Sequence, residues 1–345
     1  MDLQIDICND IDENEWNSVV YNSKDGSIFH TIDWVNLFEK EYGEKVLIGA
    51  WLNGKLVGVF PSIVGGREIF PKHIRSFMLG YDLGGPVSIN TDPQIIKEMI
   101  CKFEEIAKTK ANKATIVVPC NGNGVSEFEG VGFSKRLEST FIVDLKKPVD
   151  ELWNNLDKSA RKSVRKANKS GLSVRLAEKR SEIETYYDLF LDTTNKAGLD
   201  LGFRSKNFYY NIWDKLHAKG LAKIFFIEYN DEIIAGSVNL VYKKTIIGFC
   251  TGMFSDYRAY QPSSLLYWHI IEWGNKNGFE YLDLGGGLYV PSLYQFKKKW
   301  GGELNHYYIF TKTYPSLKYK LLQAYYGIRR PLHKLKKRII KNEIY

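Results

Sequence analysis

The chain has 345 residues, of which 44% are hydrophobic and 14% aromatic, and its formal net charge is +8. This composition excludes an intrinsically disordered chain, and the length exceeds what one hydrophobic core usually supports, so we expect two domains. The four scattered cysteines argue against a disulfide framework and indicate a reducing compartment. The acidic N-terminus lacks the apolar core of a secretory signal, and no apolar run reaches the ~20 residues of a membrane span. We therefore expect a cytoplasmic protein.

Charge is distributed unevenly along the chain. Residues 1–50 hold eleven acidic and three basic residues, a net charge of −8, so the remaining residues carry +16 to give the total of +8. This excess favours a phosphate-rich partner, either a nucleic acid, a nucleotide-linked precursor or an anionic membrane. Charge by itself does not distinguish among the three.

A weak internal repeat indicates how the chain is organised. Residues 46–64 and 224–242 each read as a strand, a tight turn and a second strand, and the two segments align at a constant offset of 178. The turns fall at Asn53-Gly54 and at Asn230-Asp231. The pattern predicts that one structural unit occurs twice.

The rest of each unit repeats as well. A strand-like region follows each hairpin, then a helix (92–110 and 263–276), then a short apolar strand (114–119 and 281–284). We predict a mixed α/β protein of two tandem domains, 1–147 and 148–312, each a twisted mixed sheet flanked by helices.

A basic helix is expected across residues 150–170, where the second domain begins. Its apolar positions form one narrow stripe: Trp153, Leu156, Ala160, Val164 and Ala167. Cations cover the remainder, with no acidic residue from 158 to 169: Lys158, Arg161, Lys162, Arg165, Lys166 and Lys169. We interpret this face as a contact for a tRNA acceptor stem, a pyrophosphate or lipid head groups, with Arg161 and Arg165 as candidate substrate ligands. An ordinary solvated face is the alternative.

A basic tail occupies residues 313–345. Its last 21 residues contain seven basic residues against Glu343 alone, interleaved with apolar side chains. Such a tail is predicted either to lie on an anionic membrane surface or to pack on the second domain.

The segment LYQFKKKWGG, residues 293–302, follows the strand at 281–284 and three glycines, Gly285–Gly287. Glycines let the backbone turn sharply and approach a ligand closely. Phe296 and Trp300 recur at helical spacing, so a short helix would seat both on the core. Lys297 would then face a developing negative charge from a fixed element. A solvated lysine cluster is the alternative.

Four motifs in this order resemble the FemABX-like transferases, which are tandem-GNAT proteins that attach amino acids to cell-wall precursors. They are residues 27–34 (SIFHTIDW), 159–171 (SARKSVRKANKSG), 262–268 (PSSLLYW), and 283–302, which hold D-x-G-G and Y-x-F-K-x-x-x-G-G. The match covers roughly residues 25–312. It implies a tandem-GNAT fold and the formation of an amide on a cell-envelope precursor.

The resemblance also implies roles for single residues. Lys297 would stabilise charge on the transferring carbonyl or its leaving group, and the backbone of Phe296 would help to position the amine. His30 lies within the N-terminal motif and would line the cleft between the domains. Arg204 would hold phosphate, while Tyr209 and Tyr210 would stack and donate hydrogen bonds. The alternative is that these tyrosines are half-buried beside a core.

Proton removal from the amine is the role without a clear candidate. No serine, cysteine or histidine arrangement suggests covalent catalysis. Asp283, at the end of its strand, is a candidate base, and capping the following loop is the alternative. His269 and Glu272 share a helix face without a third ligand nearby, so we expect no metal.

The donor is predicted from residues 258–264, which precede the second long helix. Acetyltransferases of the GNAT type carry a glycine-rich turn there, whose amides bind the coenzyme A pyrophosphate. This stretch has no glycine and contains Pro262, which lacks an amide. This pattern therefore favours an aminoacyl-tRNA donor over acyl-CoA.

Three functions follow. The first is an aminoacyl-tRNA-dependent ligase for peptidoglycan cross-bridges. The second is a sugar or lipid N-acyltransferase of surface-polysaccharide assembly. The third is a non-catalytic scaffold with a degenerate site, which either binds anions or docks on the inner membrane face. The fold alone does not separate them.

Overall fold

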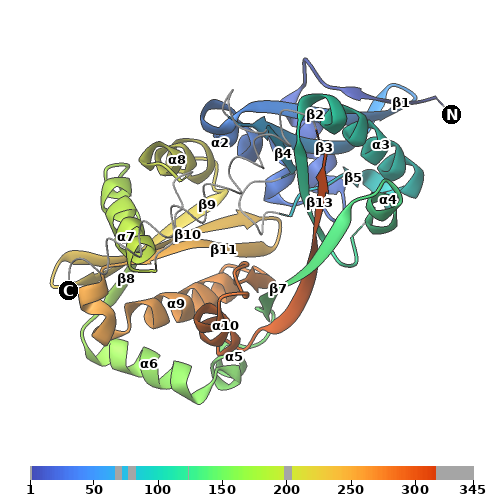
Figure 1. Cartoon of the computed structure of the whole chain (residues 1–345). Helices are drawn as coiled ribbons and strands as arrows, with labels where there is room; N and C mark the ends of the chain where they lie inside the picture. The colour runs from blue at the N-terminus through green and yellow to red at the C-terminus, as the bar shows by residue number, and fades with distance from the viewer. Residues whose placement is uncertain (1, 67–71, 77–82, 123, 198–203, 316–345) are drawn as a thin grey trace, which may run out of the picture.

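The computed structural model describes residues 2–66, 72–76, 83–122, 124–197 and 204–315 (Figure 1). The strands are β1 (Leu3–Ile7), β2 (Glu44–Leu52), β3 (Lys55–Gly65), β4 (His73–Ser76), β5 (Val87–Ser88), β6 (Lys113–Pro119), β7 (Ser134–Asp144), β8 (Ser173–Leu176), β9 (Ala222–Tyr229), β10 (Glu232–Tyr242), β11 (Thr245–Met253), β12 (Tyr281–Asp283) and β13 (Glu303–Thr313). The α-helices are α1 (Glu13–Asn22), α2 (Ile32–Tyr42), α3 (Pro93–Lys110), α4 (Val125–Gly130), α5 (Val149–Asn155), α6 (Lys158–Lys169), α7 (Glu182–Lys196), α8 (Lys206–Asn211), α9 (Pro262–Lys276) and α10 (Pro291–Lys298). Helix α8 continues into a π-helical turn at Ile212–His217.

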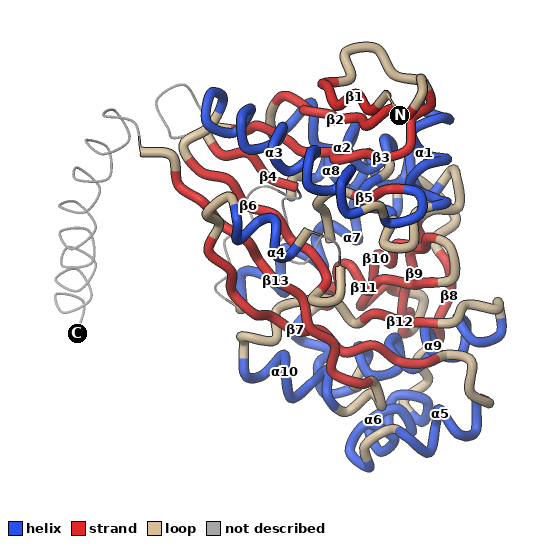
Figure 2. The backbone as a smooth tube through the Cα atoms, turned by 90° about the vertical axis from the view of Figure 1, so that its right-hand side faces the viewer, coloured by secondary structure: helices blue, strands red, loops and turns tan. Residues whose placement is uncertain are grey.

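All strands belong to one mixed sheet. Their order is β1-β2-β3-β4-β6-β13-β7-β12-β11-β10-β9-β8, with β5 paired to β3. Figure 2 shows this sheet crossing the whole molecule, with α5 and α6 at its foot. The mixed α/β class predicted from the sequence is therefore confirmed.

The duplicated hairpins are present, and their details agree. Asn53, Gly54, Asn230 and Asp231 all have positive φ, as a two-residue hairpin turn requires. Each hairpin also carries a break in register, between Ala50 and Trp51 in the first and between Ile233 and Ala235 in the second. The turns superpose at an offset of 177, so the predicted offset of 178 was wrong by one residue.

The two halves exchange their last strands. In the first half, β3 and β4 are antiparallel and β4 and β6 are parallel. The second half repeats this pattern: β10 and β11 are antiparallel, and β11 and β12 are parallel. Strand β7 then pairs with β12 of the second half, while β13 pairs with β6 of the first. The exchanged strands also pair with each other along their length. The boundary at 147/148 stays a prediction, because secondary structure crosses between the halves on both sides of it.

The hydrophobic core consists of three clusters, one in each half and one that joins the halves. One cluster fills the space between α3 and the first half of the sheet, and a second lies between α6, α9 and the second half. A third joins the halves, since Trp34 of α2, Phe208 of α8 and Ile247 of β11 all belong to it. The ring of Trp34 is 5.5 Å from that of Phe249, across the two halves.

The basic connecting helix differs from its prediction. It consists of two helices, α5 and α6, because Leu156 and Asp157 have extended backbone angles. The Asp157 carboxylate accepts a hydrogen bond from the Ser159 N–H at 2.7 Å and caps α6. Aspartate favours this N-cap position over a helix interior, which explains the break.

Candidate active site

Helix α10 is anchored by aromatic packing. Pro291 begins it, and the fully buried Trp300 follows its end. The ring centroids of Phe296 and Trp300 lie 5.0 and 5.3 Å from that of Tyr267 on α9. This confirms the expected short helix and fixes the direction of the lysine between the two aromatic residues.

Lys297 is buried, with only 5% of its side chain exposed. Its ammonium donates hydrogen bonds to the carbonyl oxygens of Gly285, at 2.8 Å, and Gly286, at 2.7 Å. An ammonium has three N–H donors, so one is left for a ligand. Burial lowers the pKa of Lys297 to about 8, although the nearby Asp283 opposes the shift. The alternative of a solvated cluster is wrong for this lysine, while its neighbour Lys298 is exposed.

Asp283 supports the loop that holds the lysine. Its Oδ1 accepts hydrogen bonds from the Gly285 N–H at 2.8 Å and from the Thr140 hydroxyl at 2.6 Å. Burial raises the pKa of Asp283 to about 7, against the opposing effects of the Gly285 N–H and Lys297. The carboxyl group thus has the geometry of the loop cap, and it also titrates near neutral pH.

Thr140 was not among the predicted site residues. It lies on β7, the strand exchanged from the first half, and its hydroxyl is also 3.0 Å from the Gly285 carbonyl oxygen. No local sequence signal identifies it, because its role depends on the pairing of β7 with β12. The exchange of strands therefore completes the site.

Gly285 is required by its surroundings. Its φ is +75°, and a Cβ there would lie 2.7 Å from the Gly248 carbonyl oxygen of β11. Strand β11 pairs with β12 only from Thr245 to Ile247, and from there to Met253 it is paired with β10 on its other side. The glycine loop follows the end of β12 and lies against β11 at Gly248.

A second cluster gathers around Cys250 of β11. An Arg204 Nη donates to the Cys250 sulfur at 3.1 Å, and the guanidinium carbon lies 4.9 Å from the Phe249 ring centroid. The Tyr209 hydroxyl is 3.4 Å from the same sulfur, and burial raises its pKa well above the usual value. The structure thus unites Arg204 and Tyr209 two residues beyond Gly248. No local pattern around Cys250 predicts this position, because it depends on the packing of α8 against β11.

Tyr210 lies apart from that cluster. It is half-buried, and the Arg180 guanidinium carbon is 4.3 Å from its ring centroid. Arg180 in turn forms a bidentate ion pair with Asp214, at 2.7 and 2.8 Å. Tyr209 is fully buried, so the core alternative describes it better than the stacking one.

Three other predicted ligands have structural contacts. His30 is 1% exposed and accepts from the Ser27 N–H, and burial lowers its pKa to about 4, so the ring is neutral near pH 7. Arg161 donates to the Asn154 carbonyl oxygen at 2.7 Å. The Arg165 guanidinium carbon lies 5.5 Å from the Trp153 ring centroid. The two arginines therefore hold α5 against α6.

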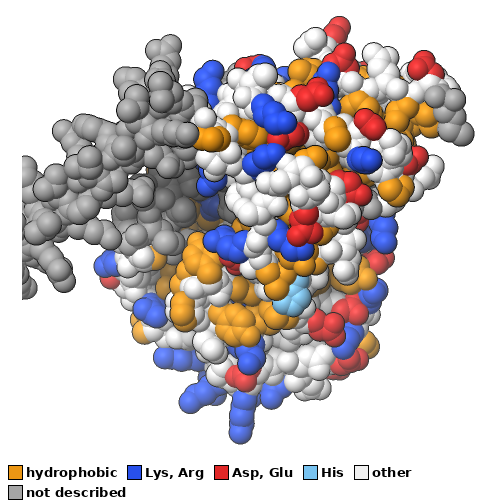
Figure 3. All heavy atoms as spheres, turned by 45° about the vertical axis from the view of Figure 1, so that its right-hand side comes forward, with side chains coloured by type: hydrophobic (Ala, Val, Ile, Leu, Met, Phe, Trp, Pro, Cys, Tyr) orange, Lys and Arg blue, Asp and Glu red, His pale blue; other side chains and the backbone are white. Residues whose placement is uncertain are grey.

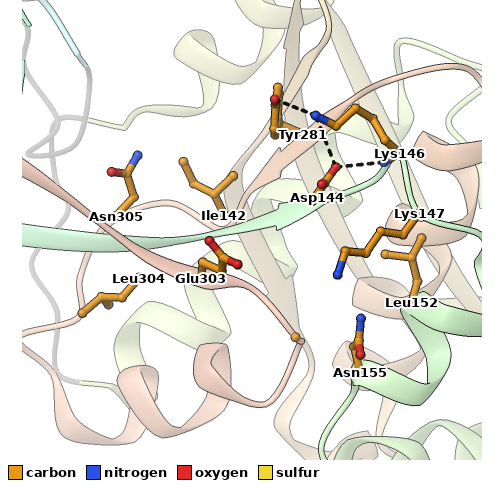
Figure 4. A pocket seen from close by; sticks show the side chains of 11 residues that line it. Ile142, Asp144, Lys146, Lys147, Leu152, Asn155, Tyr281, Glu303, Leu304 and Asn305 are labelled. Atoms are coloured by element: carbon orange, nitrogen blue, oxygen red, sulfur yellow. Dashed lines mark hydrogen bonds and ion pairs between the residues drawn. The ribbon is translucent and has the colours of Figure 1, made fainter. Parts of the chain in front are cut away.

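A cavity of about 320 Å³ is lined by residues of β7, β12 and the start of β13 (Figure 4). Ile142 lines it and is the cross-strand partner of both Asp283 and Glu303, so these three residues share a face of the sheet. Lys147 and Asn155 line it as well. Acidic and basic side chains thus line a cavity next to β12, the strand that carries Asp283.

The start of α9 is unsuited to a pyrophosphate. Pro262 occupies its first position, and the N–H of Ser264 donates to the Gln261 carbonyl oxygen at 3.0 Å. Amides that are absent or already bonded do not cradle phosphate. Within the described ranges, no three His, Cys, Asp or Glu residues group as metal ligands, and no helix is long and apolar enough to cross a bilayer.

The chain is similar to proteins with the GNAT fold. The acetyltransferase (GNAT) domain family matches residues 154–298. Among solved structures, FemX superposes with a TM-score of 0.71 at 17% identity, over 94% of this chain and 99% of that one. A tandem GNAT protein from the clavulanic acid biosynthesis pathway follows with 0.59 at 10% identity, over 91% and 99%. L-PGS from Bacillus licheniformis has 0.56 at 13% identity, over 92% and 97%. The fold is that of a tandem-GNAT protein.

Within this class, the chain resembles the FemABX-like transferases. Lipid II:glycine glycyltransferase of Staphylococcus aureus (strain MRSA252) is 23% identical over 248 residues, which are 66% of this chain. The chain spans 56% of the length of that relative. The match agrees with the family that the four sequence motifs indicated.

Proposed function

We propose that this chain transfers an aminoacyl or acyl group to a free amine of a cell-envelope precursor, forming an amide. The observation that carries the proposal is the buried ammonium of Lys297, which two glycine carbonyls orient and which retains a third donor. The activity named for the Staphylococcus aureus relative makes glycine the first candidate for the transferred residue. The same name makes lipid II the first candidate acceptor.

The reaction needs an oxyanion stabiliser more than a nucleophilic side chain. The amine attacks the carbonyl of an ester, a C–N bond forms, and the C–O bond to the leaving group breaks. Lys297 would donate its third N–H to the carbonyl oxygen while that oxygen carries negative charge. The proton released by the amine ends on the leaving oxygen.

Asp283 and Phe296 would position the reacting groups. Asp283 holds the Gly285 N–H, and the Gly285 carbonyl holds Lys297, so the carboxylate acts on the lysine through the loop. Phe296 lies in the last turn of α10, where backbone carbonyls lack partners within the helix. Such a carbonyl would accept a hydrogen bond from the incoming amine.

Arg204 remains the candidate for holding the acceptor, while Tyr210, which lies against Arg180, stays a prediction. Arg204 stands beside β11, the strand that the glycine loop touches, and its planar guanidinium suits a phosphate or carboxylate. We assign Tyr209 and His30 to the support of these elements, because both are buried.

An aminoacyl-tRNA is the proposed donor. The first turn of α9 offers a poor cradle for the pyrophosphate of coenzyme A, and an ester on a ribose needs none there. A lipid-linked acceptor would require the protein to reach a membrane surface. The tail that would serve this contact lies outside the described residues beyond Pro315.

The test is transfer by the purified full chain. Radiolabelled glycyl-tRNA is mixed with lipid II in detergent micelles, and label in the lipid fraction is measured with and without RNase treatment of the donor. A parallel arm supplies acyl-CoA. RNase-sensitive labelling is expected. Label from acyl-CoA alone would favour the N-acyltransferase, and no label from either donor would contradict the proposal.

A further inference from the structure

Four lysines form a stripe along α6. Lys158, Lys162, Lys166 and Lys169 are spaced four, four and three residues apart, so they lie on one face of the helix over about 16 Å. All four are exposed. Ala160, Val164 and Ala167 occupy the opposite, buried face. We call this set the lysine stripe.

The lysine stripe is not neutralised by its surroundings. No ion pair of the described residues involves any of the four lysines, whereas lysines elsewhere, such as Lys206 with Glu184 at 2.7 Å, do have partners. Arg161 and Arg165 differ, because they contact α5 and Trp153. Figure 3 shows cationic side chains projecting from the lower edge of the molecule, where Figure 1 places α6.

The stripe leads to the candidate active site. The Asp157 N–H, at the start of α6, donates to the Lys299 carbonyl oxygen at 2.9 Å. Lys299 directly follows α10, the helix that carries Lys297. The start of α6 therefore lies beside the end of α10, and a linear polyanion lying along α6 would have one end near that helix.

The chemistry of the face favours RNA over a lipid surface. A helix that binds a bilayer presents apolar side chains for insertion beside its cations. The apolar residues of α6 are buried, and its exposed residues are lysine, arginine, serine and asparagine. Contact through charge alone, along a line, is typical of a phosphate backbone.

We propose that the lysine stripe binds the phosphate backbone of the RNA donor and directs its acylated 3′ end toward Lys297. This rests on the proposed function, because it assigns a surface to the donor of that reaction. The contacts would be independent of sequence and sensitive to salt.

The experiment measures RNA binding directly. The full chain is titrated with a deacylated RNA minihelix that copies a tRNA acceptor arm, at several salt concentrations. In the test variant all four stripe lysines become Gln, which keeps helix propensity and removes four charges. The control variant changes four exposed lysines on other elements to Gln: Lys24, Lys55, Lys97 and Lys179. Circular dichroism and thermal unfolding verify that both variants fold.

The expected result is a selective loss. Each phosphate contact contributes about 0.9 to the slope of log K against log salt, so the loss of four contacts should make the slope of the test variant shallower by about 3.6. Its affinity at low salt should fall ~10–100-fold, while the control stays within about 3-fold of the parent. Equal loss in both variants would overturn the proposal, as would unchanged RNA binding by the test variant.

Two further outcomes separate this proposal from others. Sedimentation with phosphatidylglycerol vesicles tests the lipid alternative: loss of vesicle binding with RNA binding intact would overturn the RNA assignment. If RNA binding depends on the lysine stripe but no glycyl transfer is found with any donor, the proposed function fails and the binding surface stands.

Discussion

Lys297 is the residue whose environment is least usual for its type. A charged lysine is rarely buried without a specific partner, and here two backbone carbonyls and a neighbouring carboxyl compensate it. Such an arrangement costs stability and is typical of a functional group. The next residue, Lys298, is exposed, so it serves as the control when Lys297 is substituted.

Removal of the ammonium should abolish most of the activity. We expect Lys297→Met to lower kcat/KM for glycyl transfer by about 100-fold or more, because an oxyanion donor typically contributes that much. Lys298→Met should stay close to the parent. Lys297→Arg should not rescue, since a planar guanidinium does not fit two carbonyls placed for an ammonium. Full activity of Lys297→Met would refute the assignment.

The pH profile tests the charge of the same group. Lys297 acts as a cation, and its pKa is about 8, so kcat/KM should fall as the pH rises through that value. Asp283 raises the pKa of Lys297 by its charge, so Asp283→Asn should move this alkaline limb to lower pH. The Asn carbonyl can still accept from the Gly285 N–H, so the loop should persist. Complete loss of activity at every pH would instead identify Asp283 as the base.

At the scale of elements, the glycine loop connects β12 to α10 under tight constraints. Gly285 and Gly278 have nearly the same positive φ, +75° and +74°, but different neighbours. An added Cβ at Gly285 would meet the Gly248 carbonyl oxygen, whereas nothing lies within 4 Å of one at Gly278. The two positions thus separate backbone strain from steric collision.

Substitution by alanine should reveal that difference. Gly278→Ala carries only the left-handed strain and should reduce the free energy of unfolding by about 1 kcal/mol, with activity retained. Gly285→Ala adds the collision, should cost more stability, about 1–3 kcal/mol, and should displace the carbonyls that hold Lys297. Urea unfolding and kcat/KM measure the two effects. Equal activities of the two variants would contradict the role of the loop.

At the scale of the whole molecule, the exchanged strands make the two repeats one cooperative body. Strand β13 fills the space between β6 and β7, and one core cluster contains residues of both halves. Without β13 the edge of β6 would be unpaired, and without β7 the edge of β12 would be unpaired. Thr140 shows the consequence for function, because a strand from the first half supplies a group to the site of the second.

The chain should therefore unfold in one transition. We expect urea denaturation curves from tryptophan fluorescence and far-UV circular dichroism to coincide, because separation of the halves would expose the edges of β6 and β12. Residues 1–147 expressed alone should aggregate, since they lack β13. Two separated transitions, or a soluble folded fragment, would show that the halves are independent.

Local patterns in the sequence were sufficient for much of this protein. The paired hairpin turns, the long helices, the glycine loop and the anchored lysine all follow from residue spacing, turn chemistry and the positions of glycine and proline. These signals involve only a few neighbouring residues, so they can be recognised in the sequence without knowledge of the fold. The motifs also indicated the FemABX-like class.

Only the tertiary structure decided the exchange of β7 and β13 and the place of Thr140 and Cys250. The partner of a strand depends on backbone groups far away in the chain, and local periodicity carries no record of it. Burial likewise depends on what packs from outside the segment. That is why Tyr209 and Tyr210, adjacent in sequence, differ in burial: Tyr209 is a core residue and Tyr210 is half-buried.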